Sequence, residues 1–117
     1  MRKKLFLMWM PVVIMMSSSA FAAADANAGK IKYQQLCVSC HGASGKGDGP
    51  AAVALTPKPR NFSDSKGKTD AQLAKVIKEG GAANNLSPLM PPWGAGLTDQ
   101  DIANIIAYLR VLGKGGQ

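Results

Sequence analysis

Two cysteines and the single histidine of this 117-residue chain lie within five consecutive residues, Cys37-Val38-Ser39-Cys40-His41. On a helix, side chains three and four positions apart lie on the same face, so both thiols and the imidazole would project from neighbouring points. C-x-x-C-H is the pattern of covalent c-type haem attachment, in which the thiols bond to the porphyrin and the imidazole binds the iron. We therefore predict one covalently bound haem c held by Cys37 and Cys40, with His41 as an iron ligand.

The same residue types also serve a plain disulfide, a thioredoxin-like redox pair or half of a zinc site. A structural zinc site needs four ligands, whereas the whole chain offers two cysteines and one histidine. A thioredoxin-like protein has a strand before its cysteine pair, and no strand pattern precedes Cys37. These alternatives stay open, but the residues favour the haem.

A methionine is the best candidate for a second iron ligand. Five of the six methionines lie within the first 16 residues, which leaves Met90 alone in the rest of the chain. Most methionines fill gaps in a core. Here, however, Pro91 and Pro92 follow Met90 and hold it in a rigid, extended segment, as a ligand requires. This context favours Met90 as the second axial ligand of the iron.

The N-terminus has the three-part layout of a secretory signal peptide: a basic start, an apolar stretch over residues 5–16 and small residues up to Ala24. The apolar stretch is 12 residues long, whereas a membrane-spanning helix needs about 20. We predict a signal peptide over residues 1–22, with cleavage after Ala22 or after Ala24, and a mature domain over residues 23–117. The protein would then be periplasmic, meeting a membrane only through partners or an uncleaved signal.

The charge balance changes when the signal peptide is removed. The whole chain has 14 basic and 7 acidic residues and a net charge of +7. Three of the basic residues belong to the signal peptide, so the mature chain carries +4. This modest charge favours weak docking to acidic proteins and excludes a nucleic-acid footprint. The lysines that we expect to steer a partner are Lys46, Lys58, Lys66 and Lys68.

The elements that position these residues are predicted to be helices. Three stretches have helical periodicity, and none alternates with the period of a strand, which predicts an all-α fold. Capping residues and glycines place the ends of the helices. The predicted helices run from Asp25 or Asn27 to His41-Gly42, from Thr69 to Gly80-Gly81, and from Thr98 to Gly113.

Two long segments rich in glycine and proline separate these helices, over residues 42–64 and 82–96. Long segments without structure of their own usually have a function, and we expect these two to wrap the haem. Polar loop groups could contact the haem propionates; the candidates are Arg60, Asn61 and Trp93.

The chain resembles the class I cytochromes c, the small monohaem family of bacterial periplasmic type, over essentially everything after residue 25. The resemblance is carried by Cys37-Val38-Ser39-Cys40-His41, Gly47-Asp48-Gly49-Pro50, Met90-Pro91-Pro92-Trp93 and Leu109-Arg110. It implies a small single-domain fold of three or more helices, with long loops wrapped around one haem. It also implies that the first and last helices cross through Gly29, Tyr33 and Tyr108.

The resemblance further implies a role for each site residue. Cys37 and Cys40 would form the thioether bonds, His41 would be the proximal ligand and Met90 the distal ligand. The carbonyl of Pro50 would accept a hydrogen bond from the other nitrogen of His41, which would orient the imidazole.

With both axial positions filled, the iron has no vacancy for a substrate, so the expected function is one-electron transfer between redox partner proteins rather than catalysis. No small-molecule substrate is expected. Two alternatives remain: a haem subunit of a larger dehydrogenase or oxidase complex, and a ligand-binding or peroxidatic haem protein if Met90 dissociates.

Overall fold

The computed structural model describes residues 3, 10–14, 22–64 and 67–115 of the chain, and every regular element in this part is helical. The all-α prediction is therefore confirmed. Most of the predicted signal peptide, namely residues 1–2, 4–9 and 15–21, lies outside the described residues. The elements are α1 (Ala26–Leu36), α2 (Val38–His41), η1 (Pro50–Ala54), η2 (Phe62–Asp64), α3 (Asp70–Glu79), η3 (Ala82–Asn84) and α4 (Asp99–Gly113). No helix in the described part is long and apolar enough to cross a membrane.

The first predicted helix is in fact two helices. Asp25 caps α1 by accepting hydrogen bonds from two amides of the first turn, as predicted, but the helix ends at Leu36 rather than at His41. Cys37 separates α1 from α2 with φ −114° and ψ −32°. The main-chain bonds from Cys37 to Tyr33 and from His41 to Cys37, both 2.8 Å, continue across this point. The helix is therefore kinked at Cys37, but the backbone stays right-handed and helical hydrogen bonds span the kink.

The other two helices begin where their caps predict. Thr69 and Gln72 form the predicted capping box at α3, and Gly80 ends that helix at φ 82°. Thr98 caps α4 through a capping box with Asp101, and α4 ends at Gly113, as predicted. Local side-chain chemistry thus determines both starts.

Helices α1 and α4 cross at the predicted residues. A side chain at Gly29 would overlap the main-chain carbonyl of Asn104 in α4, so only glycine allows this approach. Tyr33 is fully buried, and its ring meets that of Tyr108 edge to face, with 5.3 Å between the ring centroids. The crossing therefore joins the first and last helices of the described chain.

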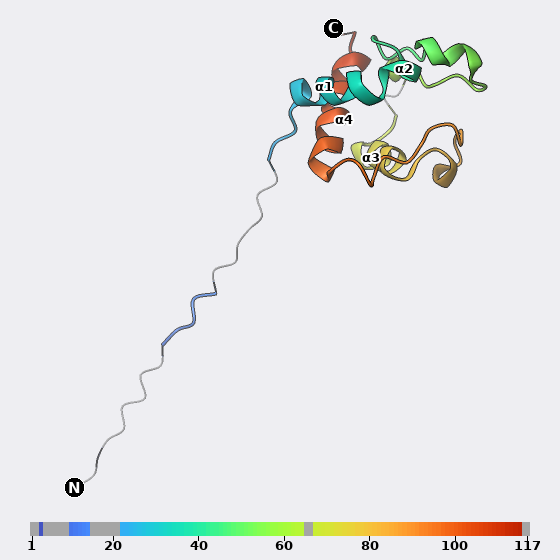
Figure 1. Cartoon of the computed structure of the whole chain (residues 1–117). Coiled ribbons are helices and arrows are strands. Elements are labelled where there is room, and N and C mark those ends of the chain that lie inside the picture. Colours follow the sequence, from blue (N-terminus) through green and yellow to red (C-terminus); the bar gives the residue numbers. More distant parts are fainter. Residues whose placement is uncertain (1–2, 4–9, 15–21, 65–66, 116–117) are drawn as a thin grey trace.

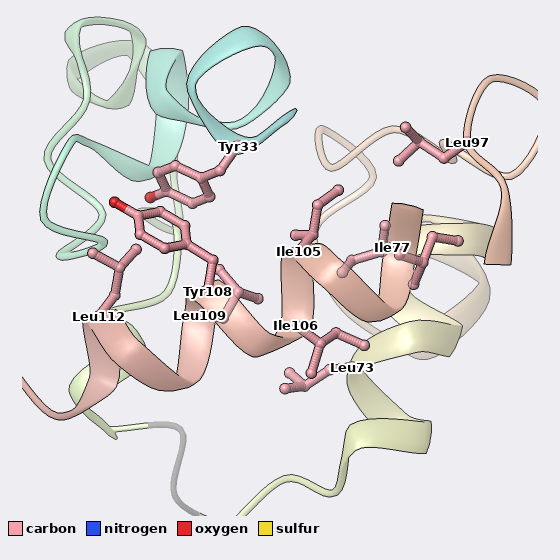
Figure 2. Close-up of a cluster of buried hydrophobic side chains, with 10 residues drawn as sticks. Tyr33, Leu73, Ile77, Leu97, Ile105, Ile106, Tyr108, Leu109 and Leu112 are labelled. Carbon is pink, nitrogen blue, oxygen red and sulfur yellow. The ribbon is translucent and has the colours of Figure 1, made fainter. Parts of the chain in front are cut away.

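The core has an aromatic and an aliphatic part, both built on α4 (Figure 2). Tyr33 and Tyr108 lie side by side with Leu112 near the C-terminal end of α4. Ile77 and Ile105 belong to the aliphatic part, where α3 packs on α4. α4 thus holds the α1–α2 half and the α3 half together.

Two long connections extend to the same side of the α1–α4 crossing (Figure 1). The first connection, residues 42–64, follows α2 and contains η1 and η2. The second connection, residues 80–98, joins α3 to α4 and contains η3. The two predicted loops thus occur where expected, but each has short helical turns of its own.

Candidate functional site

The Cys37–His41 motif is presented by α2 and the kink before it. Cys37 caps both neighbouring helices, while Cys40 and His41 lie in the four-residue turn of α2. All three side chains are half-buried, and both cysteines are free thiols. The local sequence alone therefore brings two thiols and an imidazole to one turn of helix.

The protonation state of Cys37 bears on the thioredoxin-like alternative. Burial, and secondarily the nearby Cys40, raises the pKa of the Cys37 thiol to about 11. The nucleophilic cysteine of a thioredoxin-like pair has a lowered pKa, because the thiolate is the reactive form. Cys37 is the opposite case, a half-buried thiol with a raised pKa. This environment disfavours the thioredoxin-like chemistry.

The imidazole of His41 is enclosed on one side. Its Nδ1 atom is buried with no completed hydrogen bond among the described residues. Burial lowers the pKa of His41, and the backbone of Arg60 acts in the opposite direction. A backbone group raises the pKa of a histidine by accepting a hydrogen from the protonated ring, so the Arg60 group that does this is its carbonyl. With Nδ1 enclosed by protein, Nε2 is the nitrogen left for an iron.

His41 Nδ1 has no completed hydrogen bond among the described residues, so the bond predicted from the Pro50 carbonyl is absent there. Pro50 instead opens η1, where proline is favoured because its fixed φ suits the first position of a helix. The residue before it, Gly49, donates its N–H to the Cys40 carbonyl at 3.1 Å. The backbone acceptor on the His41 side comes from Arg60, ten residues later, so Pro50 is corrected to a structural role beside α2.

Phe62 is a site residue that the sequence analysis missed. Its ring stacks on the His41 imidazole, with 4.9 Å between the centroids and 24° between the planes. It also meets Tyr33 edge to face at 6.4 Å. Counting phenylalanines, as was done for methionines, would have pointed to Phe62. Two of the three, Phe6 and Phe21, lie in the predicted signal peptide, so Phe62 is the one left in the predicted mature domain.

The first connection is closely fitted to α2. Gly47 donates its N–H to the His41 carbonyl at 2.9 Å. It has φ 75°, and a side chain there would overlap the Pro59 carbonyl. Gly45 accepts from the Phe62 N–H at 2.8 Å, and its φ is 68°. These glycines let the segment that carries Arg60 and Phe62 return against His41.

Met90 lies in the second connection and is held by its main chain. Its carbonyl accepts from Gly81 at 2.9 Å and its N–H donates to Ser87 at 3.2 Å. The residues after it are tied to the end of α3, with a bond of 2.9 Å from Trp93 to the Ile77 carbonyl. The Met90 side chain is half-buried. The connection therefore presents its thioether from a segment attached to α3.

The predicted propionate and steering residues lie mainly on the first connection. Arg60 is exposed and Asn61 is half-buried. Trp93, on the second connection, packs against the core. Among the lysines, Lys46 and Lys58 are exposed and Lys68 is half-buried, while Lys66 lies outside the described residues.

The donor set fits a haem better than a protein-bound metal ion. Within the described ranges, no group of three or more His, Cys, Asp and Glu side chains could hold a metal ion, so the zinc alternative has no ligand set there. A haem iron takes four ligands from its porphyrin and needs only two from the protein. An imidazole, a thioether and two thiols meet this need.

Comparisons with known proteins agree with this donor set. A family model described as cytochrome c oxidase, cbb3-type, subunit III matches residues 24–109. Cytochrome c-554(547) of Halothiobacillus neapolitanus is 35% identical over 95 residues, which cover 77% of this chain and 99% of that protein. Cytochrome c-554(548) of Halomonas halodenitrificans is 36% identical over 86 residues, which cover 74% and 94%.

A solved structure has a similar fold. A chain of the reducing HAO-like protein complex of Kuenenia stuttgartiensis matches with a TM-score of 0.65 and 29% sequence identity. The match covers 80% of this chain and 44% of the solved one, so this chain spans less than half of that protein's length.

Proposed function

Since the chain belongs to the c-type cytochrome family described as cytochrome c oxidase, cbb3-type, subunit III, it is a small haem-binding electron carrier, and we propose how its residues perform that function. One haem c is attached through thioether bonds to Cys37 and Cys40. His41 and Met90 would be the two protein ligands of its iron. The observation that carries this proposal is that α2 and its N-cap residue Cys37 present both thiols and an imidazole whose other nitrogen is enclosed.

The bound haem supplies an iron that gains and loses a single electron. His41 fixes the iron to α2, and the soft thioether of Met90 favours the ferrous state, which raises the reduction potential relative to two histidine ligands. With His41 and Met90 as its two protein ligands, the iron would have no position open to a substrate. The protein is therefore a carrier and not an enzyme.

The carrier works outside the cytoplasm. The motivation is the layout of residues 1–24, in which a basic start, an apolar stretch and small residues follow in the order of a signal peptide. Cleavage after Ala22 or Ala24 leaves a periplasmic protein without the three basic residues of the start. Sequencing the N-terminus of the exported protein tests this part of the proposal.

Its partners are redox proteins that dock transiently. Lys46 and Lys58 are exposed on the first connection, close in sequence to the residues around His41. A small interface with a few exposed charges suits fast association and release. The second connection has no charged residue from Gly80 to Thr98, so steering falls to the His41 side of the molecule.

Mass spectrometry and optical spectra of the exported protein test the central claim. We expect a mass increased by one haem, no thiol available for alkylation, and a haem spectrum that survives denaturation. The native ferric protein should also have the charge-transfer band of an iron–sulfur bond. A haem-free mass with two alkylatable thiols would contradict the attachment, and absence of the sulfur band alone would contradict Met90.

The likeness to a chain of a multi-chain complex bears on a second candidate, a haem subunit fixed within a larger assembly. The relatives that match over nearly their full length are named simply as cytochromes c-554. Purification from the native membrane and periplasm separates the two. A free carrier is recovered alone, whereas a subunit is recovered with partners in constant proportion.

A further inference from the structure

The His41 ring needs something to fix its rotation. The torsion that turns an imidazole has a broad preference, so the side chain's own rotamer does not set the orientation of the ring plane. In metal-binding histidines a hydrogen bond to the second nitrogen usually does so. Here a main-chain acceptor at Arg60 approaches Nδ1 but does not complete a hydrogen bond with it in the described part of the chain.

A stacked aromatic ring also lies against the face of this imidazole. The Phe62 and His41 rings lie nearly parallel, 24° apart, at 4.9 Å between centroids. Two flat rings in this arrangement resist rotation of either one, because turning one ring drives its edge into the face of the other. Phe62 thus restrains the torsion that turns the His41 ring.

Phe62 is itself fixed on several sides. Its N–H donates to the Gly45 carbonyl at 2.8 Å. A side chain at Gly45 would contact the Phe62 ring, and one at Gly113 would contact its carbonyl, so both neighbours are small where Phe62 passes. The fully buried Tyr33 meets the Phe62 ring edge to face at 67°.

The support extends back to the residue after His41. The hydroxyl of Tyr33 donates to the Gly42 carbonyl at 2.6 Å. One buried tyrosine therefore contacts both the stacking ring and the main chain next to the histidine. Tyr33 belongs to α1, which packs on α4, so this support rests on the best-packed part of the molecule.

From these contacts we propose that Phe62 is a positioning residue of the iron-binding histidine: its stack fixes the plane of the His41 imidazole. The inference rests on the proposed attachment of haem at Cys37, Cys40 and His41. It deepens that proposal, because the orientation of an axial imidazole plane determines how unpaired spin is distributed over a ferric haem.

The test compares haem-loaded full-length variants by proton nuclear magnetic resonance of the ferric state. The four haem methyl resonances report the imidazole plane. Phe62→Tyr keeps the stack and should retain the order and spacing of these resonances, whereas Phe62→Leu should change both and shift the reduction potential. Val53→Ala, at a highly exposed site on the same connection, should match the unmodified protein. Unchanged resonances in Phe62→Leu would overturn the proposal.

A second measurement needs no variant and decides the case if Phe62→Leu fails to fold. In the ferrous protein, ring protons of Phe62 and His41 should have cross-relaxation peaks with each other, and their absence would also overturn the proposal. The mass of the unmodified protein distinguishes failure of the proposed haem attachment from failure of the proposed role of Phe62. A mass without haem removes the proposed function, whereas covalent haem with unaltered resonances removes only the role of Phe62.

Discussion

Each of the two connections supports one proposed iron ligand, but in a different way. The first connection fixes His41 of α2 through contacts to its side chain and main chain together: Phe62 stacks on the ring and Gly47 bonds to the carbonyl. On the second connection, the bonds that place Met90 come from its main chain, to Gly81 and Ser87.

The supports of these two connections also differ. The first connection has glycines at positive φ where the chain passes close to itself, and it ends on η2, which packs against α4. The second is tied to the last turn of α3 by the bonds of Trp93 and Gly94. We infer that damage to the first connection disturbs folding, whereas damage to the second mainly releases the ligand.

The largest expected effect is that of Gly47→Ala. The new side chain would overlap the Pro59 carbonyl, and the residue would keep a left-handed φ of 75°. Both penalties act together, so we expect a loss of about 3 kcal/mol or more in unfolding free energy. Denaturant titration measures it. Gly67→Ala is the matched control, because nothing lies within 4 Å of that site; equal losses in the two variants would contradict the close fit.

Met90→Ala should affect the iron site more than the stability of the fold, the reverse of Gly47→Ala. The half-buried side chain contributes only about 1–2 kcal/mol through burial, so the fold and the covalent haem should persist. The sixth iron position should open, the reduction potential should fall, and the iron–sulfur band should disappear. Voltammetry and optical spectra measure these changes. An unchanged potential would mean that the second ligand is not Met90.

Sequence reasoning succeeded where neighbours in the chain decide the structure. Thr69 and Thr98 cap their helices through residues three positions later, and the motif at Cys37 fits within one turn. The α1–α4 crossing was also predicted, at Gly29 and Tyr33, because the resemblance supplied it.

It failed where the decisive contact comes from a distant segment. Phe62 and Arg60 reach His41 because the chain turns back at Gly45 and Gly47. No residue next to His41 in the sequence predicts this reversal. The pairing with Pro50 was wrong for the same reason. The kink at Cys37 was also missed, since the helical periodicity continues through it.

Tyr33→Phe should have an intermediate effect, and only on the first connection. The variant removes the buried hydroxyl that donates to the Gly42 carbonyl at 2.6 Å. That carbonyl keeps a second donor, the N–H of Gly45 at 3.1 Å, so the loss should be about 1 kcal/mol, at the lower end for a buried hydrogen bond. Thermal unfolding measures it. The iron–sulfur band should not change, and a weakened band would show that the two connections are coupled.

The smallest effect is expected from the ion pair that joins the two ends of the second connection. The Lys78 ammonium lies 2.9 Å from the Asp99 carboxylate, with 53% and 67% of their side chains exposed. Exposed pairs contribute about 0.2–1 kcal/mol and are screened by salt. Lys78→Gln should therefore lower the unfolding free energy slightly at low ionic strength and not at high ionic strength, relative to Lys75→Gln on the same helix. Residues 80–98 carry no charge, so no ion pair within the second connection can replace this one. A loss well above 1 kcal/mol would mean that the Lys78–Asp99 pair, and not the main-chain bonds to α3, holds the ends of the second connection together.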